Sequence, residues 1–140
     1  MKSESESGVP GHDTTSASLA WTLHLVGLNP RVQAILHEEI DHVLGDSKEV
    51  TNEMLNEFKY LDMVLKESLR LYPSVPSVMR ELTEEAVIGN VSLPAGTSIS
   101  VEIQLLLNNP RYWDNPSEFL PERWENESED PYLYIPFSAG

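Results

Sequence analysis

Hydrophobic positions divide the chain into a helical first half and a second half interrupted by prolines. Between residues 13 and 28, four apolar side chains recur at helical spacing, namely Leu19, Ala20, Leu23 and Val26. This spacing predicts a helix over residues 13–28.

A second helix is predicted over residues 30–44. Asn29 suits the N-cap, and Pro30 suits the first helical position, where its missing N–H needs no partner. Gly45 is a natural C-terminal cap. The apolar stripe of this helix consists of Ile35, Leu36, Ile40, Val43 and Leu44.

Two further helices are predicted before Pro73 ends the first half. The first is a short piece that runs from its cap, Thr51, to Phe58, and the second covers residues 60–72. The pattern of the second places four apolar residues inside, namely Leu61, Val64, Leu65 and Leu69. It places four charged residues outside, namely Lys59, Asp62, Lys66 and Arg70.

The second half is expected to be irregular, with some β structure, because its many prolines exclude long helices. Residues 87–93 indicate a hairpin, residues 97–103 alternate as a half-buried strand, and residues 104–108 fit a short helix. Residues 111–140 are predicted to be an ordered coil held by six aromatic side chains, Trp113, Phe119, Trp124, Tyr132, Tyr134 and Phe137. The predicted fold class is mainly α with a small β portion.

The composition narrows the possible functions. With 9 Lys and Arg against 23 Asp and Glu, the 140 residues carry a net charge of −14, so nucleic-acid phosphates and anionic membranes would repel them. There is no cysteine, which excludes disulfides, thiolate metal sites and cysteine nucleophiles within the chain. The 140 residues contain no run of 18 apolar residues, the length needed to span a bilayer. The polar residues 1–10 are predicted to be disordered.

Two motifs in the first half could carry chemistry, and each has a structural alternative. Residues 11–15, Gly-His-Asp-Thr-Thr, are either a helix N-cap or an acid beside an alcohol, a pair that can relay protons to a ligand. Glu67 and Arg70 share one helix face, which in most proteins is an exposed ion pair. His37 and His42 lie about 140° apart around a helix, so they do not share a metal.

Four motifs in this order and spacing resemble the signatures of the cytochrome P450 superfamily, the haem-thiolate monooxygenases. Residues 11–15 are similar to the distal-helix motif, and Glu67-x-x-Arg70 is similar to the E-x-x-R helix. Arg123 resembles the arginine that completes the E-R-R triad, and residues 137–140 resemble the opening of the haem-binding loop. The first motif and the helix boundary at Asn29 and Pro30 are also similar to those of microsomal family-4 enzymes, many of which hydroxylate fatty acids.

The resemblance implies site residues of three kinds. They are the catalytic residues Asp13 and Thr14, the haem-binding residues Arg80, Phe137 and Gly140, and the structural triad Glu67, Arg70 and Arg123. The catalytic pair would deliver protons to bound dioxygen, and the arginine of the second group would pair a haem propionate. The phenylalanine would pack near the haem face, and the glycine would open the turn toward a ligand cysteine, so the chain itself holds no metal ligand.

The implied domain covers residues 11–140 and is expected to stop before the haem-ligating cysteine. The complete protein is expected to hydroxylate a lipophilic small molecule, with electrons from NADPH through NADPH-cytochrome P450 reductase. It is expected at the cytosolic face of the endoplasmic reticulum membrane, held by segments that these 140 residues lack. The chain alone is expected to be inactive. Two alternatives are a non-catalytic binding or regulatory polypeptide and an acidic scaffold with accidental motif matches.

Overall fold

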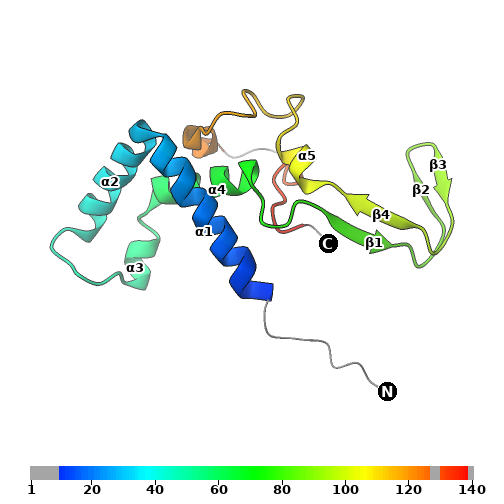
Figure 1. Cartoon of the computed structure of the whole chain (residues 1–140), viewed down its shortest axis with the longest axis horizontal. Coiled ribbons are helices and arrows are strands. Elements are labelled where there is room, and N and C mark those ends of the chain that lie inside the picture. The colour runs from blue at the N-terminus through cyan, green and yellow to red at the C-terminus, as the bar shows by residue number, and fades with distance from the viewer. Residues whose placement is uncertain (1–9, 127–129, 139–140) are drawn as a thin grey trace, which may run out of the picture.

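The computed structural model describes residues 10–126 and 130–138. Residues 1–9, which make up most of the segment predicted to be disordered, lie outside the described residues, and so does Gly140. Figure 1 shows helices gathered on one side, with two small β-sheets extending from the other. The predicted class, mainly α with a small β portion, is confirmed.

In the described residues, four helices come first along the chain and are followed by four strands and two short helices. The first part contains α1 (Pro10–Leu28), α2 (Pro30–Leu44), α3 (Asn52–Leu55) and α4 (Lys59–Leu71). The second part contains β1 (Val78–Glu81), β2 (Ala86–Ile88), β3 (Val91–Leu93), β4 (Ser98–Val101), α5 (Ile103–Leu107) and the 3-10 helix η1 (Pro121–Glu125). The helix expected to run from Thr51 to Phe58 is only 4 residues long.

The predicted helix boundaries at Asn29 and Gly45 are confirmed, but the side chain of Asn29 does not cap α2 as expected. Instead its Nδ2 donates to the backbone oxygen of Leu25 at 2.8 Å, which satisfies a carbonyl at the end of α1. Gly45 ends α2 with a φ of 51°, a conformation that glycine adopts without steric cost.

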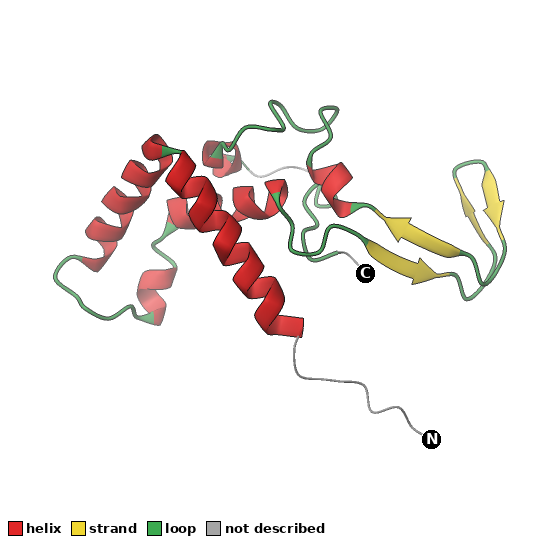
Figure 2. Cartoon of the chain, viewed as in Figure 1, coloured by secondary structure: helices red, strands yellow, loops and turns green. Residues whose placement is uncertain are grey.

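The main core forms where α4 packs against α1 and α2, and Figure 2 shows the long α1 crossing α4. Its buried side chains are Leu25, Val26, Val32, Leu36, Tyr60, Val64, Leu71 and Phe119. Phe119 comes from the segment that leads into η1, so the irregular second half closes the core that the helices begin. A smaller core contains Ile103, Leu107 and Trp113.

The apolar residues of α1 do not all face the core. Val26 is buried, but Leu19 and Leu23 are 52% and 73% exposed. Thr22 is buried instead, and its Oγ1 donates to Oγ of Ser68 on α4 at 2.8 Å. Apolar side chains occur all around this helix, so their spacing does not select the face that packs.

The β structure consists of two separate antiparallel pairs, β1 with β4 and β2 with β3. The β2–β3 hairpin matches the prediction for residues 87–93, whereas the hydrophobic pattern does not predict β1. The strand predicted over residues 97–103 ends at Val101, because Ile103 begins α5, where it is fully buried.

The predicted role of the aromatic side chains in the last segment holds for four of the six. Those that are buried or half-buried are Trp113, Phe119, Trp124 and Tyr134. Tyr132 and Phe137 are 68% and 81% exposed, so the prediction that these two hold the coil is wrong. Within the described residues, no helix is both long and apolar enough to cross a membrane.

Candidate functional site

Glu67, in the middle of α4, is the centre of a buried network of hydrogen bonds. Its side chain has 0% exposure, and its Oε2 and Oε1 accept from Nε and Nη2 of Arg70, both at 2.9 Å. Oε1 also accepts from the backbone N of Leu120 at 3.1 Å and from Nε of Arg123 at 2.9 Å. Oε2 accepts from Nε1 of Trp124 at 3.0 Å. One carboxylate therefore joins α4 to residues 120–124. We call the side chains of Glu67, Arg70, Arg123 and Trp124 the Glu67 network.

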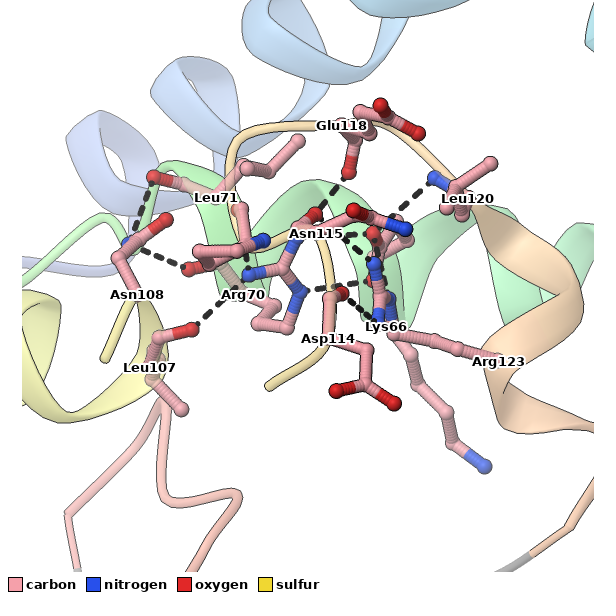
Figure 3. Close-up of polar contacts among 12 residues, drawn as sticks. Lys66, Arg70, Leu71, Leu107, Asn108, Asp114, Asn115, Glu118, Leu120 and Arg123 are labelled. Atoms are coloured by element: carbon pink, nitrogen blue, oxygen red, sulfur yellow. Dashed lines mark hydrogen bonds and ion pairs between the residues drawn. The ribbon is translucent and has the colours of Figure 1, made fainter. Parts of the chain in front are cut away.

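Arg70 is the second fully buried charge of this network. A guanidinium has five N–H donors. Two of those of Arg70 bind Glu67, and the other three donate to backbone oxygens (Figure 3). These belong to Leu107, Pro116 and Glu118, at 3.0, 2.9 and 3.2 Å. The outward orientation predicted from the hydrophobic pattern is wrong, since Arg70 is 0% exposed. These acceptors all come from the later, irregular half of the chain.

Arg123 of η1 completes the contact set. Besides Glu67, it donates from Nη1 to the backbone oxygen of Asp114 at 3.0 Å and from Nη2 to that of Asn115 at 3.4 Å (Figure 3). The structure therefore brings Glu67, Arg70 and Arg123 together. Removing one partner of such a buried pair costs about 3–5 kcal/mol, because it leaves an uncompensated charge.

A second ion pair fastens η1 to the helices. Glu122 accepts from Nη1 and Nη2 of Arg31 at 2.7 and 3.0 Å and from the hydroxyl of Tyr60 at 2.9 Å. The Arg31 hydrogen bonds lower the pKa of Glu122 to about 2, and burial, helped by Glu122, raises the pKa of Tyr60 to about 12.

At the start of α4, Glu39 accepts from the backbone N atoms of Tyr60 and Leu61 at 2.6 and 2.9 Å, where the helix dipole favours a negative charge.

A cavity lies between the N-terminal half of α1 and the residues around Phe137. It consists of two spaces of about 190 and 200 Å³ that share Thr14, Ser74 and Phe137 as lining residues. The first is further lined by Thr15, Ser18, Leu19 and Leu69, and the second by Val75, Val78, Ile103, Pro136 and Ser138. The walls are therefore apolar, with several hydroxyl groups among them.

The two residues predicted to be catalytic lie differently with respect to this cavity. Thr14 is half-buried and lines both spaces, and its Oγ1 donates to the backbone oxygen of Gly11 at 3.4 Å. The side chain of Asp13 is 74% exposed, contacts His12 at 3.3 Å and is not among the described lining residues. Because α1 begins at Pro10, neither Asp13 nor Thr14 is its N-cap.

Of the three residues predicted to bind haem, one lines the cavity. Phe137 lines both spaces of the cavity. Arg80 is exposed on β1 and donates from Nη1 to the backbone oxygen of Met79 at 3.1 Å. It lies two positions after Val78, a lining residue, and thus on the same face of the strand. Gly140 lies outside the described residues.

The donor set fits the wall of a pocket for a flat, mainly apolar group that carries carboxylates, as haem does. Apolar side chains and the aromatic ring of Phe137 line the space. Arg80 lies on the same face of β1 as the lining residue Val78. The axial thiolate does not come from these residues, because the chain contains no cysteine. In the described ranges, no group of three or more His, Cys, Asp or Glu side chains could hold a metal ion.

Several groups of the site are not marked by the sequence. Nothing in a sequence identifies the backbone oxygens that receive Arg70, because any residue type supplies the same acceptor. Glu122 and Trp124 flank Arg123 in one Pro-Glu-Arg-Trp run, and that adjacency is a signal that could have added both to the site.

Comparison with known proteins agrees with the geometry. The family model for Cytochrome P450 matches residues 8–140. Cytochrome P450 4V2 of Mus musculus is 45% identical over 134 residues, which cover 93% of this chain and 26% of that protein. Cytochrome P450 4c3 of Drosophila melanogaster is 43% identical over 135 residues, with 93% and 25% covered. Cytochrome P450 3A18 of Rattus norvegicus is 41% identical over 133 residues, with 93% and 27% covered.

The chain spans about a quarter of the length of the curated relatives it matches. The family match, in contrast, extends over nearly all of its 140 residues. Together with the buried contacts of Glu67, Arg70 and Arg123, this match shows that the chain belongs to the cytochrome P450 family.

Proposed function

We propose that these residues form part of a haem-dependent monooxygenase. The complete protein inserts one oxygen atom of O2 into a lipophilic substrate, for which a fatty acid is our first candidate. Electrons come from NADPH through NADPH-cytochrome P450 reductase at the endoplasmic reticulum membrane. The observation that carries the proposal is the Glu67 network, in which Arg70 and Arg123 share one buried carboxylate. A cavity lined by Thr14 and Phe137 supports it.

Bound haem would supply the iron that activates dioxygen. The Glu67 network has a structural task in this function, which is to hold residues 107–124 against α4. Phe137 would pack against the group, and the guanidinium of Arg80 would pair with one of its carboxylates, because a guanidinium fork matches a carboxylate.

Asp13 and Thr14 move protons between solvent and the cavity. Asp13 is well exposed, so its carboxylate exchanges protons with bulk water. Thr14 lines the cavity, where its hydroxyl can orient a proton toward a bound ligand. A carboxylate outside and a hydroxyl inside make a relay in which each group does one half of the transfer.

The test uses the complete reading frame that encodes these residues, expressed with its reductase and supplied with NADPH and a fatty acid. We expect a hydroxylated product that carries one atom from labelled dioxygen. Thr14→Val should reduce product formed per NADPH consumed by about 100-fold or more, the lower end of the range for lost proton transfer. Ser16→Ala, an exposed neighbour on α1, should leave that ratio unchanged. A product oxygen derived from water, or equal ratios in the two variants, would contradict the proposal.

We further propose that the 140-residue chain is inactive by itself. After haem is added and the iron is reduced, carbon monoxide should produce no thiolate-type absorption band, because the chain has no cysteine. A thiolate-type band would overturn this part. Size-exclusion chromatography and hydrogen exchange test the alternative of a non-catalytic binding polypeptide, which requires a single compact species with protected helices.

A further inference from the structure

The charges of the Glu67 network do not balance. Across the described ranges, the ion pairs of Arg70 and Arg123 are both made to the carboxylate of Glu67. The side chains of Glu67 and Arg70 are 0% exposed and that of Arg123 is 13% exposed. One negative and two positive charges are therefore removed from water together, and an unmatched buried cation is costly.

The ring of Trp113 lies against both guanidiniums. Its centroid is 5.3 Å from Cζ of Arg70 and 6.0 Å from Cζ of Arg123. Both distances are within the range in which the negative face of an aromatic ring attracts a cation, and tryptophan is the strongest of the aromatic residues in this respect. Trp113 is 9% exposed, so little water screens the attraction.

The polar group of Trp113 does not explain its presence. Its Nε1 is buried and has no acceptor among residues 10–126 and 130–138. A phenylalanine would fill much of this position without burying an unpaired N–H, which destabilises a folded protein. Trp124 differs, because its Nε1 donates to Glu67. The two neighbouring indoles therefore contribute different groups, an N–H from Trp124 and a ring face from Trp113.

We propose that Trp113 is a positioning residue whose ring compensates the second positive charge of the Glu67 network. It keeps Arg123 on Glu67 and thereby holds η1 against α4. The competing explanation is that Trp113 only fills space in the smaller core beside Ile103 and Leu107. The proposal concerns contacts within the chain and does not depend on haem binding.

The test replaces Trp113 site-specifically with tryptophan analogues that carry one to four ring fluorines. Fluorine withdraws charge from the ring face with little change in size, so the folding equilibrium constant should fall stepwise, by about tenfold over the series. The same series at Trp21 is the control. That ring stacks on Tyr72 at 4.2 Å, and no guanidinium lies over it in the part of the chain that the structure describes. Urea unfolding of the chain without haem measures both series.

A flat series at Trp113, or equal trends at Trp113 and Trp21, would overturn the proposal. A second measurement combines Trp113→Phe with Arg123→Met, which removes the charge of Arg123 but keeps a long side chain. The proposal requires that the effect of Trp113→Phe shrink in the Arg123→Met background, because the second cation is then absent. Additive effects would show that the ring only fills space. Neither result depends on monooxygenase activity, so failure here is distinct from failure of the proposed function.

Discussion

Replacing Glu67 with Gln tests the centre of the buried network with the smallest change of shape. The side chain keeps its length, but its negative charge is lost and one oxygen becomes an NH2 group. In the native chain, Oε2 accepts from Arg70 and Trp124, and Oε1 accepts from Arg70, Leu120 and Arg123. Either orientation of the amide therefore points N–H groups at N–H donors and leaves two guanidiniums without their counterion.

The expected loss of stability is about 3–5 kcal/mol, the cost of breaking a buried ion pair by removing one partner. This loss is large against the total of about 5–15 kcal/mol that holds a typical domain folded. With a urea dependence of about 2 kcal/mol per molar, the midpoint of unfolding should fall by about 1.5–2.5 M.

Urea titration followed by circular dichroism and tryptophan fluorescence measures this shift. Trp124 donates directly to Glu67, so its emission also reports whether η1 has left α4. The control is Glu118→Gln, which removes the same charge from an exposed side chain in the segment that α4 holds. It should change stability by no more than about 0.5 kcal/mol. Equal midpoints for the two variants would refute the view that one carboxylate holds the two halves together.

Two further predictions concern the surroundings of this network. The pKa of Glu122 is lowered from 4.5 to about 2 in the folded chain. Its pair with Arg31 therefore stabilises the fold fully above pH 4.5, and this stabilisation is lost as the pH falls from 4.5 to about 2. Arg31→Ala should flatten the acid side of a stability–pH curve, and an unchanged slope would argue against the pair. Leu107→Ala should cost about 2–5 kcal/mol in thermal unfolding, since Leu107 is 0% exposed, whereas Leu105→Ala at 70% exposure should be nearly neutral; similar losses would contradict this packing.

The local elements of the first half could be predicted because the signals for them lie within a few residues. The stop between α1 and α2 at Asn29 and Pro30, the cap at Gly45 and the β2–β3 hairpin are all where the pattern indicates. Periodicity was less informative about which face is buried. Leu19 and Leu23 of α1 are exposed, and Arg70 of α4 is buried, because distant segments decide what covers each face.

The candidate site divides in the same way. The resemblance to the P450 motifs identified Glu67, Arg70 and Arg123, and the structure brings them into contact. The motifs did not identify the ring of Trp113 or the pair of Arg31 with Glu122. Trp113 and Arg31 carry no signature of their own, and Glu122 is marked only by its place next to Arg123. The contacts of all three form only when residues 107–124 fold back on the helices.

The order of the helices and turns, the excess of acidic residues, the lack of cysteine and the family can all be recognised from the linear order of residues. Helix caps, proline stops and short motifs are local, so their chemistry can be recognised without knowing what lies nearby. The packing of distant segments buries the i, i+3 pair on α4 and brings two arginines to one carboxylate. Burial and charge balance depend on segments some fifty residues away in sequence, and that dependence is what a linear pattern does not contain.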